Sequence, residues 1–314
     1  MQRLSAGQGQ EACMPVNRRT NPHLGYPDDA RLLIINADDF GMCHAVNQAI
    51  IGTLQEGVVR STSLMVPCPW YLHAAHFLAD HPEISFAIHL TVIGDGAIYR
   101  WGPVTPHDRV PSLVDETGRF YIFDRMAEFF ARARLDELEW EFRSQIEVVL
   151  AAGLRPTHLD WHSLRIIGGR PDIHDMMFRL AREYGLALRV AGRSWIETLQ
   201  GRGFPTNDYD ILDSYGLGAT DKAARYAHLL RELPAGLSEW AVHPGLDTPE
   251  LLAIEPGDAR IRQADYDFLI SQQAKDIIRE EGIILLDYRA LQAVWREKTS
   301  LPIVSFAPLQ KMSS

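Results

Sequence analysis

Short apolar runs recur along this chain, separated by stretches that have the three- and four-residue apolar spacing of helices. This alternation is typical of βα units, in which parallel strands form a sheet covered by helices. We expect strands at residues 31–37, 58–67, 85–92, 155–162, 186–192, 238–245 and 282–288. We expect helices at about 44–56, 71–80, 136–152, 172–184, 220–232, 264–281 and 288–297. The pattern predicts an α/β fold, either a barrel or an open doubly wound sheet.

The chain shows no internal repeat and no low-complexity linker, which favours a single domain. We place this domain at residues 30–298, after an N-terminal extension (1–29) that is either flexible or packed as an arm, and before a C-terminal tail (299–314). The insertion at about 94–134 is too long for an ordinary βα loop, so we expect a lobe beside the active face. Within it, "DETG" (115–118) predicts a turn between two short strands.

Composition excludes several classes of protein. The formal charge is −10, from 31 basic and 41 acidic residues, which argues against nucleic-acid and anionic-membrane partners and favours a neutral or cationic substrate. The three cysteines form no CxxC pair, so neither a disulfide framework nor a thiolate zinc site is indicated, and a reducing compartment fits. Without a signal-peptide pattern or a membrane-length apolar stretch, the sequence predicts a cytoplasmic protein with no membrane partner.

Residues able to bind a metal or move protons lie at the predicted strand ends. They are Asp38 and Asp39 after the first strand, His89 in the third, His158, Asp160 and His162 in the fourth, and His243 in the sixth. Ligands of parallel α/β folds bind at the carboxyl ends of the strands, so we expect these side chains to converge. Each has a structural alternative, such as a hydrogen-bonded core histidine or a turn residue.

The adjacent carboxylates of Asp38 and Asp39 repel each other and lose solvation, so they need a cation or several hydrogen bonds. Two imidazoles with one carboxylate form a common divalent-metal set. One aspartate would then bind the cation while the other serves as a general base, with the imidazole of His243 protonating the leaving group. The alternative is that one aspartate caps the helix expected near His44.

The motifs resemble those of the YdjC-like carbohydrate deacetylases, the ChbG/HpnK group. The matching segments occur in family order: "NADDFG" (36–41), "SLMVP" (63–67), "AIHLT" (87–91), "PTHLDWH" (156–162), "HPG" (243–245) and "RQADYDFL" (262–269). The resemblance implies a distorted seven-stranded (β/α) barrel, related to polysaccharide deacetylases. It also implies metal-dependent removal of an acetyl group from an N-acetylated sugar.

The resemblance assigns roles to five residues. Asp39, His89 and His162 fall on the ligands of one divalent ion, with Mg²⁺ or Zn²⁺ preferred and Mn²⁺ or Co²⁺ as alternatives. Asp38 falls on the general base, and His243 on the acid or oxyanion partner. The implied partner is a small carbohydrate substrate, and a homodimer is left open.

Further residues are candidates for substrate or supporting contacts. His158 and Asp160 alternate with His162 along one predicted strand, so period-two geometry points all three to one side. We interpret Asp160 as the residue that orients a ligand histidine. Arg189 should place a positive charge near the base or the oxyanion, or else form a buried ion pair. Trp101 is either a platform for a sugar ring or an anchor for its loop.

The chain departs from the family pattern after the fourth strand. Leu164 and Ile166 stand where many members have further histidines, and Trp161 replaces a small serine. This changes the substrate contacts beside the metal ligands and suggests a substrate other than a chitooligosaccharide. We interpret Arg262 and Asp265 as structural. The alternative functions are hydrolysis of another amide or ester, and sugar binding without catalysis.

Overall fold

The computed structural model describes residues 20–163 and 170–299. The strands are β1 (Arg31–Phe40), β2 (Ser61–Leu64), β3 (Ser85–Leu90), β4 (Ile93–Gly94), β5 (Tyr121–Ile122), β6 (His158–Trp161), β7 (Ala187–Leu188), β8 (Leu212–Asp213), β9 (Gly236–Val242) and β10 (Ile284–Leu286). The α-helices are α1 (His44–Glu56), α2 (Tyr71–Asp80), α3 (Met126–Arg132), α4 (Leu135–Ala151), α5 (Pro171–Tyr184), α6 (Arg193–Gly201), α7 (Lys222–Arg231), α8 (Pro249–Ile254), α9 (Ala259–Ile270), α10 (Gln272–Glu280) and α11 (Tyr288–Thr299).

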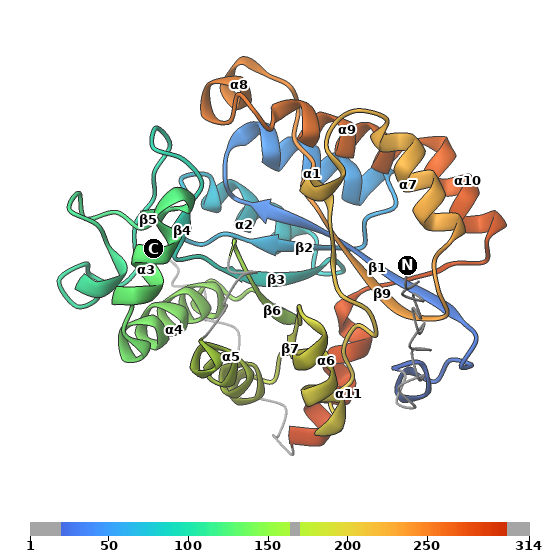
Figure 1. The fold of residues 1–314 in the computed structure, drawn as a ribbon, viewed down its shortest axis with the longest axis horizontal. Helices are drawn as coiled ribbons and strands as arrows, with labels where there is room; N and C mark the ends of the chain where they lie inside the picture. Colours follow the sequence, from blue (N-terminus) through green and yellow to red (C-terminus); the bar gives the residue numbers. More distant parts are fainter. Residues whose placement is uncertain (1–19, 164–169, 300–314) are drawn as a thin grey trace, which may run out of the picture.

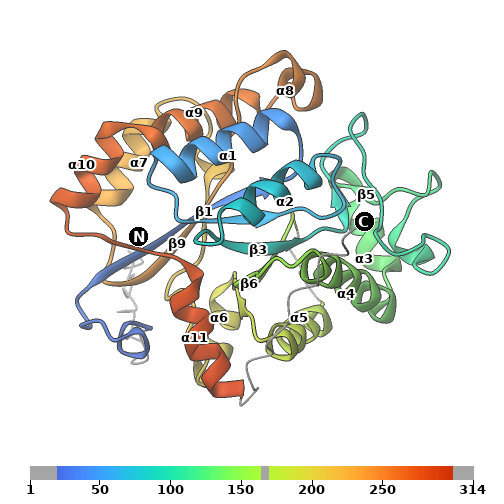
Figure 2. The ribbon, with the colours of Figure 1, turned by 180° about the vertical axis from the view of Figure 1, so that it is seen from behind.

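A curled parallel sheet forms the centre of the fold, with the strand order β7-β6-β3-β2-β1-β9-β8. One group of helices, α1, α7, α9 and α10, lies on one side of it, and a second group, α4, α5, α6 and α11, lies on the other (Figures 1 and 2). Between β7 and β8 no pairing occurs among the described residues. The predicted distorted seven-stranded (β/α) barrel is confirmed, in the form of an open half-barrel.

Two predicted elements differ from the structure in more than their bounds. The run at 282–288 does form a strand, β10, but it pairs with the first half of β1 while β2 pairs with the second half, so β10 is not one of the seven strands in sequence around the barrel. That place belongs to β8, whose two residues are too few to produce an apolar run. The single helix expected at 264–281 is divided into α9 and α10, because the hydroxyl of Ser271 caps α10 by accepting from the backbone N–H of Ala274.

The inserted lobe lies at the end of the sheet toward which the β1 arrow points (Figure 1). Its base is the parallel pair of β4 and β5. The predicted turn at 115–118 is present, but a single antiparallel bridge between Val114 and Phe120 closes it where two short strands were expected. The lobe therefore stands at the carboxyl ends of the strands, where the sequence analysis places the site.

The described part of the N-terminal extension packs on the barrel. The backbone N–H of Thr20 donates to the carboxylate of Asp208 at 3.0 Å, and Thr20 itself is buried. This favours the packed-arm alternative for residues 20–29. None of the described helices has the length and apolar character that crossing a bilayer requires.

Candidate metal and acid–base site

A local break in β1 brings its two aspartates to one site. Along a regular strand Asp38 and Asp39 would point to opposite faces. Here the pairing of β1 with β2 shifts register between Ala37 and Phe40, and Asp39 takes a left-handed conformation with φ 73°. Gly41 continues the turn with φ 103°, and a Cβ there would approach the Met65 carbonyl oxygen to 3.1 Å. The "DDFG" sequence thus permits a backbone that presents both carboxylates together.

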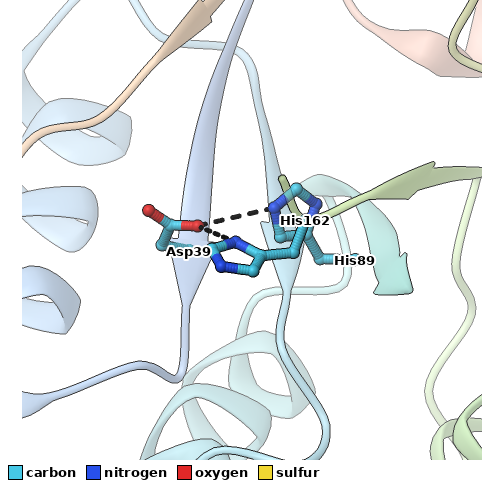
Figure 3. Close-up of side chains that lie close together, drawn as sticks. All are labelled: Asp39, His89 and His162. Atoms are coloured by element: carbon cyan, nitrogen blue, oxygen red, sulfur yellow. Dashed lines mark hydrogen bonds and ion pairs between the residues drawn. The ribbon is translucent and has the colours of Figure 1, made fainter. Parts of the chain in front are cut away.

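Asp39, His89 and His162 form a buried cluster suited to a metal. Asp39 Oδ1 lies 3.1 Å from His162 Nδ1 and 3.4 Å from His89 Nε2, and the carboxylate faces both rings (Figure 3). Their ligand atoms all lie within 4.8 Å of one another. One carboxylate and two imidazoles at this spacing could hold a divalent ion such as Zn²⁺ or Mg²⁺.

Each histidine uses its other ring nitrogen on a second carboxylate. His89 Nδ1 lies 2.8 Å from Asp160 Oδ1, and His162 Nε2 lies 2.7 Å from Asp95 Oδ1. Burial alone would lower the pKa of His89, but the charge of Asp160 and its hydrogen bond raise that pKa to about 9. The two carboxylates fix the orientation of the rings, as is usual around metal sites.

A guanidinium accompanies each aspartate of the β1 pair. Arg189 donates to Asp38 Oδ2 at 2.7 Å and to Oδ1 at 2.9 Å. Arg262 donates to Asp39 Oδ2 at 2.8 Å. Burial would raise the pKa of each carboxyl, but the adjacent arginine and the neighbouring histidines together outweigh it, so the pKa of Asp38 is lowered and that of Asp39 falls well below its usual value. Both aspartates are therefore anionic at neutral pH.

A second triad, Asp38, His89 and Asp160, also has ligand atoms within 4.8 Å of one another. Arg189 already supplies a positive charge there, because its Nη1 lies 2.7 Å from Asp38 and 3.1 Å from Asp160. Its Nε donates to Glu239 at 2.7 Å. The sequence predicts that Arg189 either places a positive charge near the base or forms a buried ion pair. Both hold, because Arg189 forms buried ion pairs and one of its partners is Asp38.

His243 faces Asp38 from the end of β9. Its Nε2 lies 4.0 Å from Asp38 Oδ2, while its Nδ1 lies 2.9 Å from the hydroxyl of Ser214. The backbone N–H of His243 donates to Asp265 at 2.9 Å. The ring is thus held on its far side by Ser214, and Nε2 is directed toward Asp38.

Among the described residues, two of the predicted ones form no hydrogen bond or ion pair with this arrangement. His158 is buried against Tyr288, with the rings stacked at 3.5 Å, and belongs to the interior of the barrel. Trp101 is 2% exposed, and its indole N–H donates to the Ile93 carbonyl at 3.0 Å. Its burial agrees with the alternative in which Trp101 anchors its loop, and leaves no open ring face for a sugar.

The helix-cap alternative for the aspartate pair is wrong. The backbone N–H groups of His44 and Ala45, at the start of α1, donate to Glu250 of α8 at 3.4 and 2.8 Å. Glu250 thus takes the role that an aspartate would have in a helix cap.

Sequence reasoning missed Asp95, Ser214 and Glu239. Glu239 carried a signal, because a lone carboxylate inside the apolar run of β9 needs a buried partner. Asp95 and Ser214 carried none, because each follows a two-residue strand. The departures at Leu164 and Ile166 lie outside the described residues.

Known proteins resemble this chain over most of its length. A family described as "YdjC-like protein" matches residues 32–280. A carbohydrate deacetylase of Enterococcus faecalis is 34% identical over 272 residues, which cover 82% of this chain and 97% of the relative. One from Geobacillus stearothermophilus is 33% identical over 261 residues, with coverages of 82% and 97%. The crystal structure of a proposed cellobiose-phosphate cleavage protein from E. faecalis has a TM-score of 0.71 at 30% identity, covering 83% of this chain and 99% of that chain.

Proposed function

The chain belongs to the YdjC-like protein family, as its motifs predict, and on this premise we propose that it is a metal-dependent carbohydrate deacetylase. The reaction is hydrolysis of the acetamide of an N-acetylated sugar, which gives acetate and a free amine. Relatives named carbohydrate deacetylase support this proposal, since the chain covers 97% of the length of each of the two described above. The net charge of −10 is compatible with a small neutral carbohydrate.

The observation that carries the proposal is the convergence of Asp39, His89 and His162 beside a base candidate. We assign these three residues as ligands of one divalent ion, with Mg²⁺ or Zn²⁺ preferred and Mn²⁺ or Co²⁺ as alternatives. When bound, such an ion supplies Lewis acidity, which polarises a carbonyl and lowers the pKa of water. The ordered carboxylates behind both histidines support this assignment.

Asp38 is assigned as the general base. Asn36 and Arg189 occupy both lone pairs of Oδ1, and Arg189 occupies one of Oδ2, which leaves one lone pair on Oδ2 to accept a proton from water. Arg189 keeps the carboxylate ionised and fixes its plane. Positioning of this kind is what general-base catalysis requires.

His243 is assigned as the acid that delivers a proton to the leaving nitrogen of the sugar. Its Nε2 lies 4.0 Å from Asp38 Oδ2, so an acetamide bound beside both residues could receive a proton from His243 on its leaving nitrogen, while the attacking water loses a proton to Asp38. Ser214 and Asp265 hold the ring and the backbone of His243. As the alternative, the same Nε2–H would donate to the oxyanion.

Acetate release tests the proposal. Protein treated with a chelator is offered a panel of N-acetylated mono- and disaccharides, with Zn²⁺, Mg²⁺, Mn²⁺ or Co²⁺ added singly. We expect acetate and free amine in equal amounts, and only when metal is present. Phosphate release from phosphorylated sugars without acetate would favour another hydrolase, and sugar binding without any product would favour a binding protein.

A further inference from the structure

Asp95 connects the inserted lobe to the candidate metal site. It directly follows β4, at the start of the lobe, and its Oδ1 lies 2.7 Å from His162 Nε2. Its side chain is 26% exposed, yet its Oδ2 is buried without a hydrogen-bond partner among the described residues. Burying a carboxylate oxygen has a free-energy cost, so the contact between Asp95 and the imidazole of His162 must compensate for that cost.

The geometry separates Asp95 from the ligands themselves. The two ring nitrogens of His162 face different carboxylates, Nδ1 toward Asp39 and Nε2 toward Asp95. In the described part of the chain, two sets of three residues have ligand atoms within 4.8 Å of one another, and Asp95 belongs to neither. A carboxylate that accepts from Nε2–H leaves the Nδ1 lone pair available to a cation and makes Nδ1 more basic.

The two histidines are supported by different parts of the fold. His89 is held by Asp160, which is fully buried in β6 and bound by Ser63 and Arg189. His162 follows β6 and is held from the lobe, through Asp95. Trp101 of the same lobe packs edge-on against the His162 ring, with the centroids 5.9 Å apart. One ligand therefore depends on the barrel and the other on the lobe.

We propose that Asp95 is a positioning residue for His162, which makes the lobe part of the metal site and sets a share of its metal affinity. This inference rests on the proposed function only in that His162 is taken as a ligand. It goes beyond that function because the predicted ligand set and base lie on the barrel alone.

Co²⁺ titration of the metal-free full chain tests this, with affinity measured by calorimetry and coordination by visible absorption. We expect Asp95→Ala to weaken Co²⁺ binding about 10- to 100-fold, the usual effect of removing a carboxylate behind a ligand histidine. Asp95→Asn should weaken it less, because an amide oxygen can still accept from Nε2–H. Asp124→Ala is the matched control, since it removes an exposed carboxylate of the same lobe and should leave the affinity unchanged.

Equal Co²⁺ affinity in Asp95→Ala and the wild type would overturn the inference. So would a saturated Co²⁺ spectrum that changes in Asp95→Ala, because Asp95 would then be a ligand itself. Circular dichroism of the metal-free variants checks that they are folded. If Asp95→Ala does not fold, the Co²⁺ affinity of Asp95→Asn tests the inference instead. A wild type that binds Co²⁺ without releasing acetate would count against the proposed function and leave this inference standing, whereas no Co²⁺ binding by the wild type would overturn both.

Discussion

Arg189 donates to both carboxylate oxygens of Asp38, at 2.7 and 2.9 Å, across 151 positions of sequence. The same guanidinium contacts Asp160 and Glu239, so one buried cation compensates three buried carboxylates. Removing a partner from such a set leaves uncompensated charge in a low-dielectric interior. The candidate acid–base site and the stability of the barrel therefore depend on one side chain.

Replacing Arg189 by methionine should be strongly destabilising. We expect the free energy of unfolding to fall by about 3–5 kcal/mol, the usual cost of breaking a buried ion pair from one side. Urea unfolding followed by circular dichroism measures it. The control is Arg193→Met, which removes an exposed arginine paired with Glu197 and should barely move the urea midpoint. Similar midpoints for the two variants would contradict this account of Arg189.

Replacing Ser214 by alanine should slow turnover without weakening substrate binding. The hydroxyl of Ser214 lies 2.9 Å from His243 Nδ1 and helps to fix the ring. The loss of one such hydrogen bond, at about 0.5–1.5 kcal/mol, corresponds to a decrease in kcat of roughly 2- to 10-fold with KM unchanged. Steady-state acetate release measures both constants, and Ser194→Ala on the exposed face of α6 is the control. A change confined to KM would show that Ser214 acts on the substrate and not on His243.

Glu139 should make stability depend on pH. Hydrogen bonds from Arg179 and then Arg143, acting against burial, lower the pKa of Glu139 from 4.5 to about 2. A carboxyl with a lowered folded pKa stabilises the protein above its unfolded pKa, and this stabilisation is lost as pH falls toward the folded value. The gap in urea midpoint between the wild type and Glu139→Gln should therefore be full at pH 7 and much smaller at about pH 3.

The matched control for this pH dependence is Glu232→Gln, at an exposed glutamate beyond the end of α7. The urea midpoint of Glu232→Gln should equal that of the wild type at both pH values. If the difference in urea midpoint between the wild type and Glu139→Gln were as large at pH 3 as at pH 7, the ion pairs of Glu139 with Arg143 and Arg179 would not be its cause.

Much of the fold could be predicted because its signals are local. The bounds of α1 and α2 agree with the expected ranges, since apolar spacing and polar ends are visible in the sequence. Of the barrel strands, β8 could not be found, because its two residues pair through the backbone with Trp240 and Ala241 of β9, and backbone pairing leaves no mark on side-chain type. The family predicted from the motifs is confirmed by the match over residues 32–280.

The candidate site could be predicted only in part. Its strand-end residues could be named, because parallel topology brings strand ends together. The left-handed turn at Asp39 could not be predicted, and it is what brings Asp39 to the side of Asp38. Strand periodicity places His158, Asp160 and His162 on one side, but β6 ends at Trp161, so this periodicity does not extend to His162. Contacts from the lobe, such as that of Asp95, depend on tertiary packing alone.

The central claim is that Asp39 belongs to the metal set and Asp38 to proton transfer. Asparagine is the suitable substitute at both positions, because it fits the space and tolerates the left-handed conformation at residue 39. The decisive measurement is metal content together with acetate release for the two variants. We predict that Asp39→Asn loses both, whereas Asp38→Asn keeps the metal and loses about 10²- to 10⁴-fold in turnover. The claim would be contradicted if Asp38→Asn lost the metal while Asp39→Asn kept it. Undiminished acetate release by the metal-free wild type would also contradict the claim.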